Sequence, residues 1–390
     1  MSATRRQLAP FAALSASYFA HIGFFNPYLP LWLKELGLGL VAISLLTAVQ
    51  SATRLVAPYA WGWLSDHTGE RVKLLRYGAS AALLISCGLW LPGGFWWLAG
   101  VLGLMFLHTS AMMPMSEAAM AHLVSSGGAF DARRYGRVRL WGSLGFLITA
   151  FAAGAWFERY GMGHFPAWTV LSLLAVVASV WWLPDLKEAV PAHEKKQPIG
   201  PLLRKPPVRW FFIAVFFHVL SHMGIYIFFS LYLDALGYSK TMIGLLWAVS
   251  VLVEIAWFFT QSRWLPAFSL TAWLVLCALA AVLRMGLTAA WAGLWPVLLL
   301  AQALHGLTFA AHHAVCIALL SHHFPGLQRG RGQALYAVLG YGLPGVLAGL
   351  GGGVLSARFG LASVFWVALL SSVLATLSAW QGWRLRHPRP

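Results

Sequence analysis

The sequence predicts an all-α integral membrane protein with twelve transmembrane helices in two pseudo-symmetric six-helix halves, and three observations support this fold class. Of the 390 residues, 59% are apolar and only 10% are charged, whereas soluble domains are about half apolar and about a quarter charged. The apolar residues form twelve continuous runs, and a helix of roughly 20 such residues crosses about 30 Å of hydrocarbon. A polar segment separates the first six runs from the last six. Continuous runs without strict alternation exclude a membrane β-barrel.

The twelve runs, taken in chain order, are each long and apolar enough to form a membrane-spanning helix. They cover approximately residues 8–33, 40–64, 73–92, 95–123, 136–157, 164–184, 208–233, 241–260, 267–288, 294–320, 332–356 and 361–383. The first run follows Arg5 and Arg6, as the apolar core of a signal peptide follows its basic start. It is too long for a signal peptide, contains Pro27 and Pro30, and lacks a small-residue cleavage site. We therefore interpret it as a retained first helix.

Lysine and arginine residues predict the orientation of the chain, because they are enriched in short cytoplasmic loops. With the N-terminus inside, 20 of the 27 basic residues lie in inner loops, tails or inner helix ends, and four lie outside. We therefore expect a multi-pass protein of a bacterial inner (plasma) membrane with both termini in the cytoplasm. The net charge of +16 then reflects topology. It does not indicate nucleic-acid binding, which requires a basic face on a folded polar domain.

The polar segment at residues 185–207 divides the chain. It contains acidic and basic side chains and several prolines. We interpret it as a cytoplasmic linker between an N-terminal six-helix bundle at 1–184 and a C-terminal six-helix bundle at 208–390.

The two halves are related in sequence. With an offset of 200 residues, nine of 24 positions are identical between residues 31–54 and 231–254. The same alignment pairs Arg54 with Glu254, which are opposite charges at matching depth. Internal repeats of this kind in transporters place the substrate site at the repeat interface, near the middle of the bilayer.

Five charged side chains lie at membrane depth, where each costs about 2.5–3.5 kcal/mol on insertion scales. They are Arg54, Glu117, Arg139, Glu254 and Arg284. In a structural interpretation, Glu117 pairs with Arg139, and Glu254 pairs with Arg284 or Arg54, between packed helices. A functional interpretation is favoured, because well-packed apolar residues are often as stable as a buried ion pair.

The chemistry of these residues indicates two roles. An arginine presents a planar fork that matches a carboxylate and stays protonated when dehydrated, so Arg139 or Arg54 fits the binding of an anionic substrate. A proton carrier needs an acid whose proton affinity is raised by desolvation. Glu254 fits this role, because it lies deep in its helix and the repeat aligns it with Arg54.

The segment Gly-Trp-Leu-Ser-Asp-His-Thr-Gly-Glu-Arg at residues 62–71 resembles the loop between helices 2 and 3 of the major facilitator superfamily. The family pattern is matched at Gly62, Asp66, Gly69 and Arg71. The sequence departs from it at His67 and Glu70, and the corresponding segment of the second half, residues 261–266, lacks it. The resemblance implies the major facilitator fold and a loop that latches the two halves in one state through Asp66 and Arg71.

Further segments resemble the phenylpropionate permease branch of this superfamily. They are Tyr135–Phe146, Tyr18-Phe19, the stretch from Leu31 to Gly37, and Leu304-His305-Gly306. A more distant resemblance to lactose permease implies that Glu117 and Arg139 bind substrate. It also implies that Glu254, Arg284 and His305 take part in proton coupling. The sequence differs from that permease at Thr308, where the permease has a glutamate, and at Gln302, where it has a lysine.

Weaker candidates complete the predicted substrate site. His21 and His305 lie near the predicted midplane, Trp141 is close to Arg139 in sequence, and Asn26 is a polar residue inside the first helix. Helix packing or anchoring at the membrane interface is the alternative role for Trp141 and Asn26.

Two further patterns bear on metal binding and helix geometry. His218 and His222 share a helix face, but no acid or cysteine on that face completes a ligand set, so we expect no metal. Gly345, Gly349 and Gly353 recur every fourth residue and predict close helix approach, and Pro344 predicts a bend.

Together these features predict a proton-coupled symporter that imports a small organic acid, such as an aromatic carboxylate of the phenylpropionate kind, by alternating access. The alternatives are a sugar or nucleoside proton symporter, or a proton-driven drug efflux antiporter. A membrane enzyme would need a nucleophile–base motif, a metal motif or a phosphate loop, and none is found. A scaffold would not need repeat-related buried charges. We expect a monomer in contact with lipid, with no cofactor and no nucleic acid, that is driven by the proton gradient.

Overall fold

The computed structural model of the chain describes residues 3–120, 125–126, 129–130, 132–185, 199–325 and 328–386, and these are almost entirely helical. The first part of the chain contains α1 (Ala3–Glu35), α2 (Leu40–Thr68), α3 (Arg71–Ser86), η1 (Cys87–Trp90), α4 (Phe95–Thr109), α5 (Met112–Ala119), β1 (Ser125–Ser126), β2 (Ala129–Phe130), α6 (Ala132–Tyr160), η2 (Met162–His164) and α7 (Phe165–Trp181). The second part contains α8 (Gly200–Leu203), α9 (Pro206–Ala235), α10 (Lys240–Trp264), η3 (Leu265–Ala267), α11 (Leu270–Trp291), α12 (Trp295–Ala303), η4 (Gly306–Ala311), α13 (His312–His323), α14 (Arg329–Ala337), η6 (Val338–Gly342), α15 (Leu343–Phe359) and α16 (Ala362–Arg386). The two short strands pair antiparallel, with Ser125 opposite Phe130.

Twelve helical segments of the described chain are long and apolar enough to cross a membrane, from Gln7–Glu35 to Ala362–Leu385. This confirms the predicted fold class. The largest difference concerns the eighth span, which the sequence predicts to end near residue 260 and which continues to Ala267. The polar residues at 261–263 continue the helix, because a helix end requires a change in backbone geometry and not merely a loss of apolar side chains. The end comes at the 3₁₀ turn that contains Pro266.

Three of the predicted runs are interrupted helices. The fourth run is divided into α4 and α5, and the tenth into α12 and α13 by η4, a wide π-helical turn at Gly306–Ala311. The eleventh run contains a second π-helical turn, η6, immediately before Pro344. Proline lacks the N–H of a regular helix and crowds the carbonyl one turn earlier. The bend that the sequence predicts at Pro344 stays a prediction.

The chain forms two compact units. The first comprises Met1–Gly37, Ala52–His193 and Ser239–Ala248, and the second comprises Leu38–Ser51, Glu194–Tyr238 and Val249–Pro390. Thus α2 and α10, which correspond in the sequence repeat, each begin in one unit and end in the other. The predicted linker lies mostly outside the described residues, so the domain boundaries at 184 and 208 stay a prediction.

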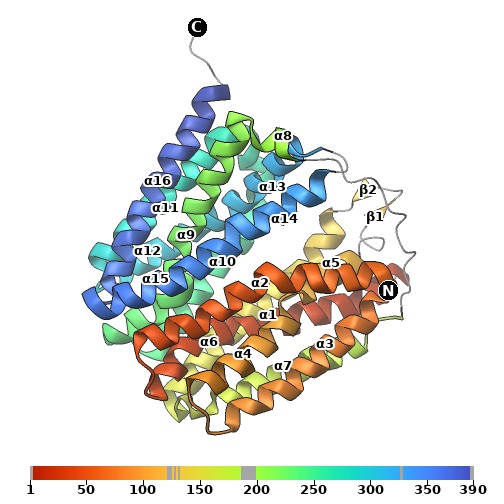
Figure 1. Cartoon of the computed structure of the whole chain (residues 1–390), viewed down its shortest axis with the longest axis vertical. Coiled ribbons are helices and arrows are strands. Elements are labelled where there is room, and N and C mark those ends of the chain that lie inside the picture. The colour runs from red at the N-terminus through yellow and green to blue at the C-terminus, as the bar shows by residue number, and fades with distance from the viewer. Residues whose placement is uncertain are drawn as a thin grey trace. The chain divides into compact units, whose positions relative to one another are not determined.

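Each unit has its own apolar core. In the first unit, α1 packs against α6 and α7, and α3 packs against α4 and α7 (Figure 1). Phe11, Met112 and Val176 are among the residues buried between these helices. In the second unit, α16 packs against α9 and α11, and Phe211 and Phe324 belong to the core. The buried side of each helix positions the polar groups described below.

The glycines of α15 allow close helix approach within the second unit, as the sequence predicts. A Cβ atom added at Gly345, Gly349 or Gly353 would overlap side-chain atoms of α2. The atoms that it would meet belong to Ser51, Ala48 and Ser44, respectively. Only glycine leaves the backbone of α15 this close to α2.

Candidate functional site

The first unit places Arg139 of α6 over an aromatic ring of α1. A Cβ atom on Gly145 would overlap the carbonyl oxygen of Ala16, and one on Gly142 would overlap the ring of Phe19. These glycines therefore allow α6 to approach α1 closely. As a result, the guanidinium carbon of Arg139 lies 4.8 Å from the centroid of the Phe19 ring, which is a cation–π contact.

Arg139 also pairs with Glu117 of α5. Its Nη1 atom lies 3.3 Å from Glu117 Oε1, and the two side chains are 38% and 34% exposed. The hydroxyl of Tyr135 donates a hydrogen bond of 3.0 Å to the same oxygen. A guanidinium carries five N–H donors, and within the described residues Arg139 uses only one on Glu117. The half-exposed cation thus keeps donors that could hold a second carboxylate.

Tyr18 of α1 is a buried residue within the electrostatic reach of two arginines. It donates a hydrogen bond to the carbonyl oxygen of Thr109, at 3.2 Å. Both Arg54 of α2 and Arg139 are near enough for their charges to act on its hydroxyl. Arg54 is half-buried and has no ion pair with any described residue. Around Tyr18 the first unit therefore gathers two guanidinium groups and one carboxylate, Glu117.

Two other predicted residues of the first unit, His21 and Trp141, have no hydrogen bond, ion pair or ring contact with this group among the described residues. His21 is buried, and its Nδ1 atom lies 2.8 Å from the Ser172 hydroxyl of α7. Asn26 is half-buried. Trp141 is 55% exposed, and within the described residues it has no ring contact with Arg139. Substrate roles for these three residues stay predictions.

Sequence reasoning did not assign Phe19 or Tyr135 to the site. Both belong to segments whose resemblance to the phenylpropionate permease branch can be recognised in the sequence. Their contacts with Arg139 and Glu117 were not visible, because these depend on the approach of α6 to α1 and α5. The glycine spacing in α6 is the signal that could have indicated the first of these contacts.

The second unit buries Arg284 of α11 completely, at 1% exposure. Its Nη1 atom donates to His305 Nδ1 and to the hydroxyl of Thr308, both at 2.9 Å. Its Nη2 atom donates to Gln302 Oε1 at 2.7 Å. Thr308 lies in the π-helical turn η4. The two positions at which the sequence differs from lactose permease, Gln302 and Thr308, are thus neutral acceptors for Arg284.

His305 connects Arg284 to Glu254 of α10. Because His305 Nδ1 accepts a hydrogen bond from Arg284, the neutral ring carries its proton on Nε2. That atom lies 3.6 Å from Glu254 Oε2. The structure therefore brings together the three residues predicted to couple protons. Among the described residues of this network, Glu254 is the one acidic side chain. It is linked to Arg284 through the imidazole ring of His305.

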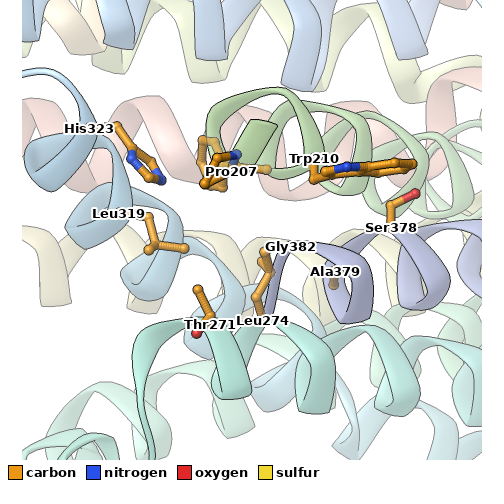
Figure 2. Close-up of a pocket in the computed structure, with 10 residues that line it drawn as sticks. Pro207, Trp210, Thr271, Leu274, Leu319, His323, Ser378, Ala379 and Gly382 are labelled. Carbon is orange, nitrogen blue, oxygen red and sulfur yellow. The ribbon is translucent and has the colours of Figure 1, made fainter. Parts of the chain in front are cut away.

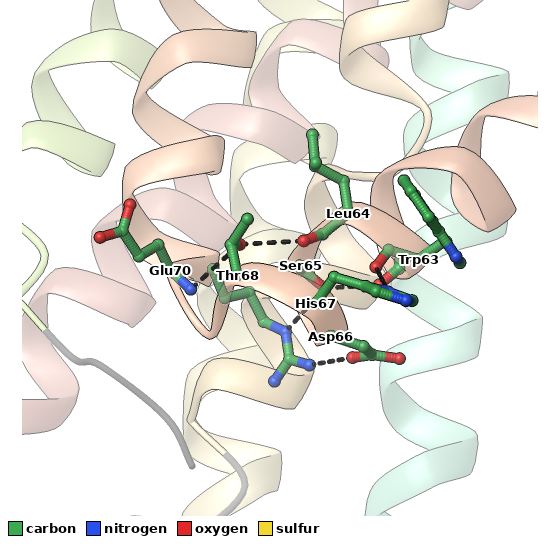
Figure 3. A network of polar contacts seen from close by, with 9 residues as sticks. Trp63, Leu64, Ser65, Asp66, His67, Thr68 and Glu70 are labelled. Atoms are coloured by element: carbon green, nitrogen blue, oxygen red, sulfur yellow. Dashed lines mark hydrogen bonds and ion pairs between the residues drawn. The ribbon is translucent and has the colours of Figure 1, made fainter. Parts of the chain in front are cut away.

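The predicted latch residues lie at the end of α2 (Gly62 and Asp66), in the turn after it (Gly69) and at the start of α3 (Arg71). Figure 3 shows Asp66 among the polar contacts of this segment. Gly69 has φ +67°, a left-handed conformation that glycine adopts without strain. Arg71 Nη2 donates to Asp66 Oδ1 at 2.9 Å, and its Nε atom lies 3.4 Å from the Ser65 hydroxyl. That hydroxyl in turn donates to the carbonyl oxygen of Gly62. Asp66 and Arg71 are thus brought together, and their action as a latch between the halves stays a prediction.

A small pocket, partly open to solvent, lies in the second unit between the ends of α9, α11, α13 and α16 (Figure 2). Its lining is mostly apolar and aromatic and includes Trp210, Phe211 and His323, together with the hydroxyl-bearing Thr271 and Ser378. None of the predicted site residues lines it. Among the described residues, no group of three or more His, Cys, Asp or Glu side chains is arranged to hold a metal ion.

Comparison with known proteins identifies the fold and the class of function. The sequence profile of the MFS_1-like family, which is part of the major facilitator superfamily, matches residues 13–367. The chain belongs to this family. This MFS_1-like protein is therefore a multi-pass membrane protein and a secondary transporter that acts on a small molecule, and it is not an enzyme.

Two curated relatives cover nearly the whole MFS_1-like chain. The "Probable 3-phenylpropionic acid transporter" of Escherichia coli (strain K12) is 26% identical over 361 residues, which cover 92% of this chain and 93% of the relative. The maltose permease of Geobacillus stearothermophilus is also 26% identical over 361 residues, which cover 92% of this chain and 90% of that permease.

Solved structures confirm the fold of this MFS_1-like protein. The nucleoside transporter NupG matches with a TM-score of 0.77 over 100% of both chains, at 13% identity. The D-xylose-proton symporter matches with a TM-score of 0.74 over 97% of this chain and 98% of the other, at 14% identity. At such identities the likeness concerns the fold alone.

Proposed function

We propose that this protein is a proton-coupled symporter of a bacterial inner membrane that imports a small aromatic carboxylate, with both termini in the cytoplasm. The observation that carries the proposal is the group around Tyr18 in the first unit. It contains two arginines, Arg54 and Arg139, and one acid, Glu117, and it therefore has an excess of positive charge. An anionic substrate would supply the missing negative charge.

The shape and chemistry of this group favour an aromatic acid. A carboxylate accepts two parallel hydrogen bonds from one guanidinium, and Arg139 keeps donors for this purpose. The Phe19 ring beneath Arg139 and the neighbouring Tyr18 offer flat apolar surface for an aromatic ring. The relative named as a probable 3-phenylpropionic acid transporter supports the same substrate class.

Proton coupling is proposed for Glu254, His305 and Arg284 in the second unit. A second proton on His305 would have to bind Nδ1, which already accepts from Arg284. Glu254 is therefore the group of this network that is free to take a proton. Protonation of Glu254 adds one positive charge to the protein, and the negative charge of a substrate carboxylate held by Arg139 balances it. Proton and anion would thus move together.

The substrate class is tested with purified protein and a thermal-shift panel of 3-phenylpropionate, its amide, maltose and a nucleoside at pH 5.5 and 7.5. We expect stabilisation by the carboxylate, stronger at the lower pH, and none by the amide. Uptake into proteoliposomes with an imposed pH gradient provides the transport readout. Equal binding and uptake of the amide would contradict the proposal.

A sugar is the second candidate, because maltose permease is as similar in sequence as the phenylpropionate relative. Glu117 and Tyr135 could then serve as hydrogen-bonding partners of sugar hydroxyls. In the same panel this alternative predicts a maltose response and no response to the carboxylate.

A further inference from the structure

Three histidines of the second unit form a buried stack that the proposed coupling network does not use. The rings of His218 and His312 are nearly parallel, with centroids 3.7 Å apart and an interplanar angle of 9°. The ring of His222 lies 4.6 Å from that of His218. All three side chains are at most 3% exposed. His218 and His222 lie on α9 and His312 begins α13, so the stack joins two helices.

Backbone carbonyl groups determine the tautomers of two of these rings. His218 Nε2 lies 2.7 Å from the carbonyl oxygen of Thr308, and His222 Nδ1 lies 2.8 Å from the carbonyl oxygen of His218. A carbonyl oxygen only accepts, so each of these nitrogens carries the proton. The other nitrogens, His218 Nδ1 and His222 Nε2, then present lone pairs. Both are buried, and neither has a partner among the described residues.

Two unpartnered lone pairs in one buried cluster are unusual, because buried polar atoms in proteins are nearly always hydrogen-bonded. A purely structural histidine would be expected to satisfy both nitrogens or to be replaced by an apolar residue. The free nitrogens are the atoms at which a neutral imidazole takes up a proton. These two nitrogens are therefore the proton-accepting atoms of the stack.

Thr308 connects this stack to the coupling network. Its hydroxyl accepts from Arg284, and its carbonyl oxygen faces His218. This arrangement depends on the π-helical turn η4, since a π turn changes the carbonyl pairing of a regular α-helix. The titratable groups that act on the stack are Arg284, His305, His313 and Cys316.

We propose that His218, His222 and His312 form a second protonation site, which binds one proton at His218 Nδ1 or His222 Nε2 and is coupled to Arg284 through Thr308. This inference rests on the proposed function. The rings of His218 and His222 lie 4.6 Å apart, and two cations at this distance would repel each other strongly in a buried site, so the stack holds a single proton. The charge of Arg284 opposes that proton until an anion compensates it. The proton comes from hydronium in the aqueous phase, so an O–H bond breaks as the N–H bond forms, and water remains.

The consequence is a stoichiometry of two protons for each carboxylate, one on Glu254 and one on the histidine stack. Import would then carry a net positive charge and respond to membrane potential as well as to the pH gradient. With Glu254 alone, the import of one proton with one carboxylate would be electrically neutral.

The protonation itself is tested on the full chain with ¹⁵N-labelled histidine rings, by NMR between pH 5 and 8. In wild-type protein without carboxylate, we expect the three rings to keep the nitrogen shifts of neutral imidazole. With saturating 3-phenylpropionate, or in Arg284→Gln without any carboxylate, one ring should move to imidazolium shifts. His218→Gln and His222→Gln, made separately, assign the signal, because it is lost in the variant that lacks the protonated ring. Three rings that stay neutral under both conditions would overturn the proposal, and the Arg284→Gln condition does not depend on the substrate.

The stoichiometry is tested in proteoliposomes by the number of protons that enter with each 3-phenylpropionate. We expect two for wild type, one for His218→Gln/His222→Gln, and two for the control His322→Gln, which changes an exposed histidine of α13. A double variant that retains two protons overturns the inference. Carboxylate transport by wild type without any proton would instead refute the proposed function. Substrate exchange without a gradient shows that each variant is folded.

Discussion

Arg139 is the residue on which the substrate class depends in the first unit. Arg139→Lys keeps the positive charge but loses the planar fork. We expect an apparent KM for 3-phenylpropionate about tenfold higher, since one charge-assisted hydrogen bond contributes about 1.5 kcal/mol. The measurement is initial uptake at a fixed pH gradient. Arg137→Lys is the matched control, because Arg137 is an exposed neighbour on the same helix. Equal KM values for both variants would show that Arg139 does not bind the substrate carboxylate.

Glu254 is the residue on which proton coupling depends in the second unit. Glu254→Gln keeps the shape and loses the exchangeable proton. At an inward gradient of one pH unit, we expect the accumulation ratio to fall about tenfold, because each coupled proton contributes a factor of about ten per pH unit. Exchange of labelled for unlabelled substrate should be unaffected. A variant that accumulates substrate as well as wild type would show that Glu254 is not the carrier.

The residue types of Gln302 and Thr308 do not reveal which group each of them binds. In sequence, they are two departures from a distant relative. In the structure, both accept hydrogen bonds from Arg284, so neutral oxygens take the place of charged groups around it. The polar character of these residues was visible, but the identity of the donor depends on how α11 packs against α12 and η4.

At the scale of elements, the approach of α6 to α1 positions Arg139. Gly145→Ala places a methyl group against the carbonyl oxygen of Ala16. Backbone atoms cannot move aside as a flexible side chain can, so we expect a loss of about 1–3 kcal/mol in stability and weaker carboxylate binding. A lower Tm in detergent measures the first effect.

Gly136→Ala is the matched control on the same helix, because nothing lies within 4 Å of its added Cβ atom. Alanine favours helix over glycine, so this variant should be as stable as wild type or slightly more stable. If both variants had the wild-type Tm, the close approach would have no energetic role.

Interrupted helices are the elements that sequence analysis described least well. Apolar runs predict the length and number of the spans, because hydropathy adds along a segment. They do not predict the π-helical turn at Gly306–Ala311, because a π turn changes the hydrogen-bond pattern without changing composition. That turn brings Thr308 to Arg284 and to His218, so both proposed proton sites depend on it.

At the scale of the whole molecule, the turn after α2 is predicted to latch one conformational state. Asp66→Asn removes the ion pair with Arg71. Because Asp66 is 55% exposed, such a pair contributes at most about 1 kcal/mol, and Tm should stay within a few degrees. We expect unchanged binding of carboxylate but slower uptake, as measured by thermal shift and by transport rate.

Glu70→Gln serves as the control, because it removes a neighbouring ion pair with Lys73 that lies within a single helical turn and bridges no other segment. We expect its uptake rate to match that of wild type. Equal rates for Asp66→Asn and wild type would show that this turn does not govern the transport cycle.

The sequence by itself determined the membrane class and the number and approximate limits of the twelve spans. These properties depend on composition along a segment, because the free energy of transferring each side chain from water to an apolar environment depends mainly on that residue. The tertiary structure alone decided which groups meet: Arg139 with Phe19, Arg284 with Gln302 and Thr308, and His218 with His312. Such pairings depend on the rotation of each helix and on close contacts made by glycines. A shift of one residue along a helix turns a side chain by about 100°, since 3.6 residues complete a turn.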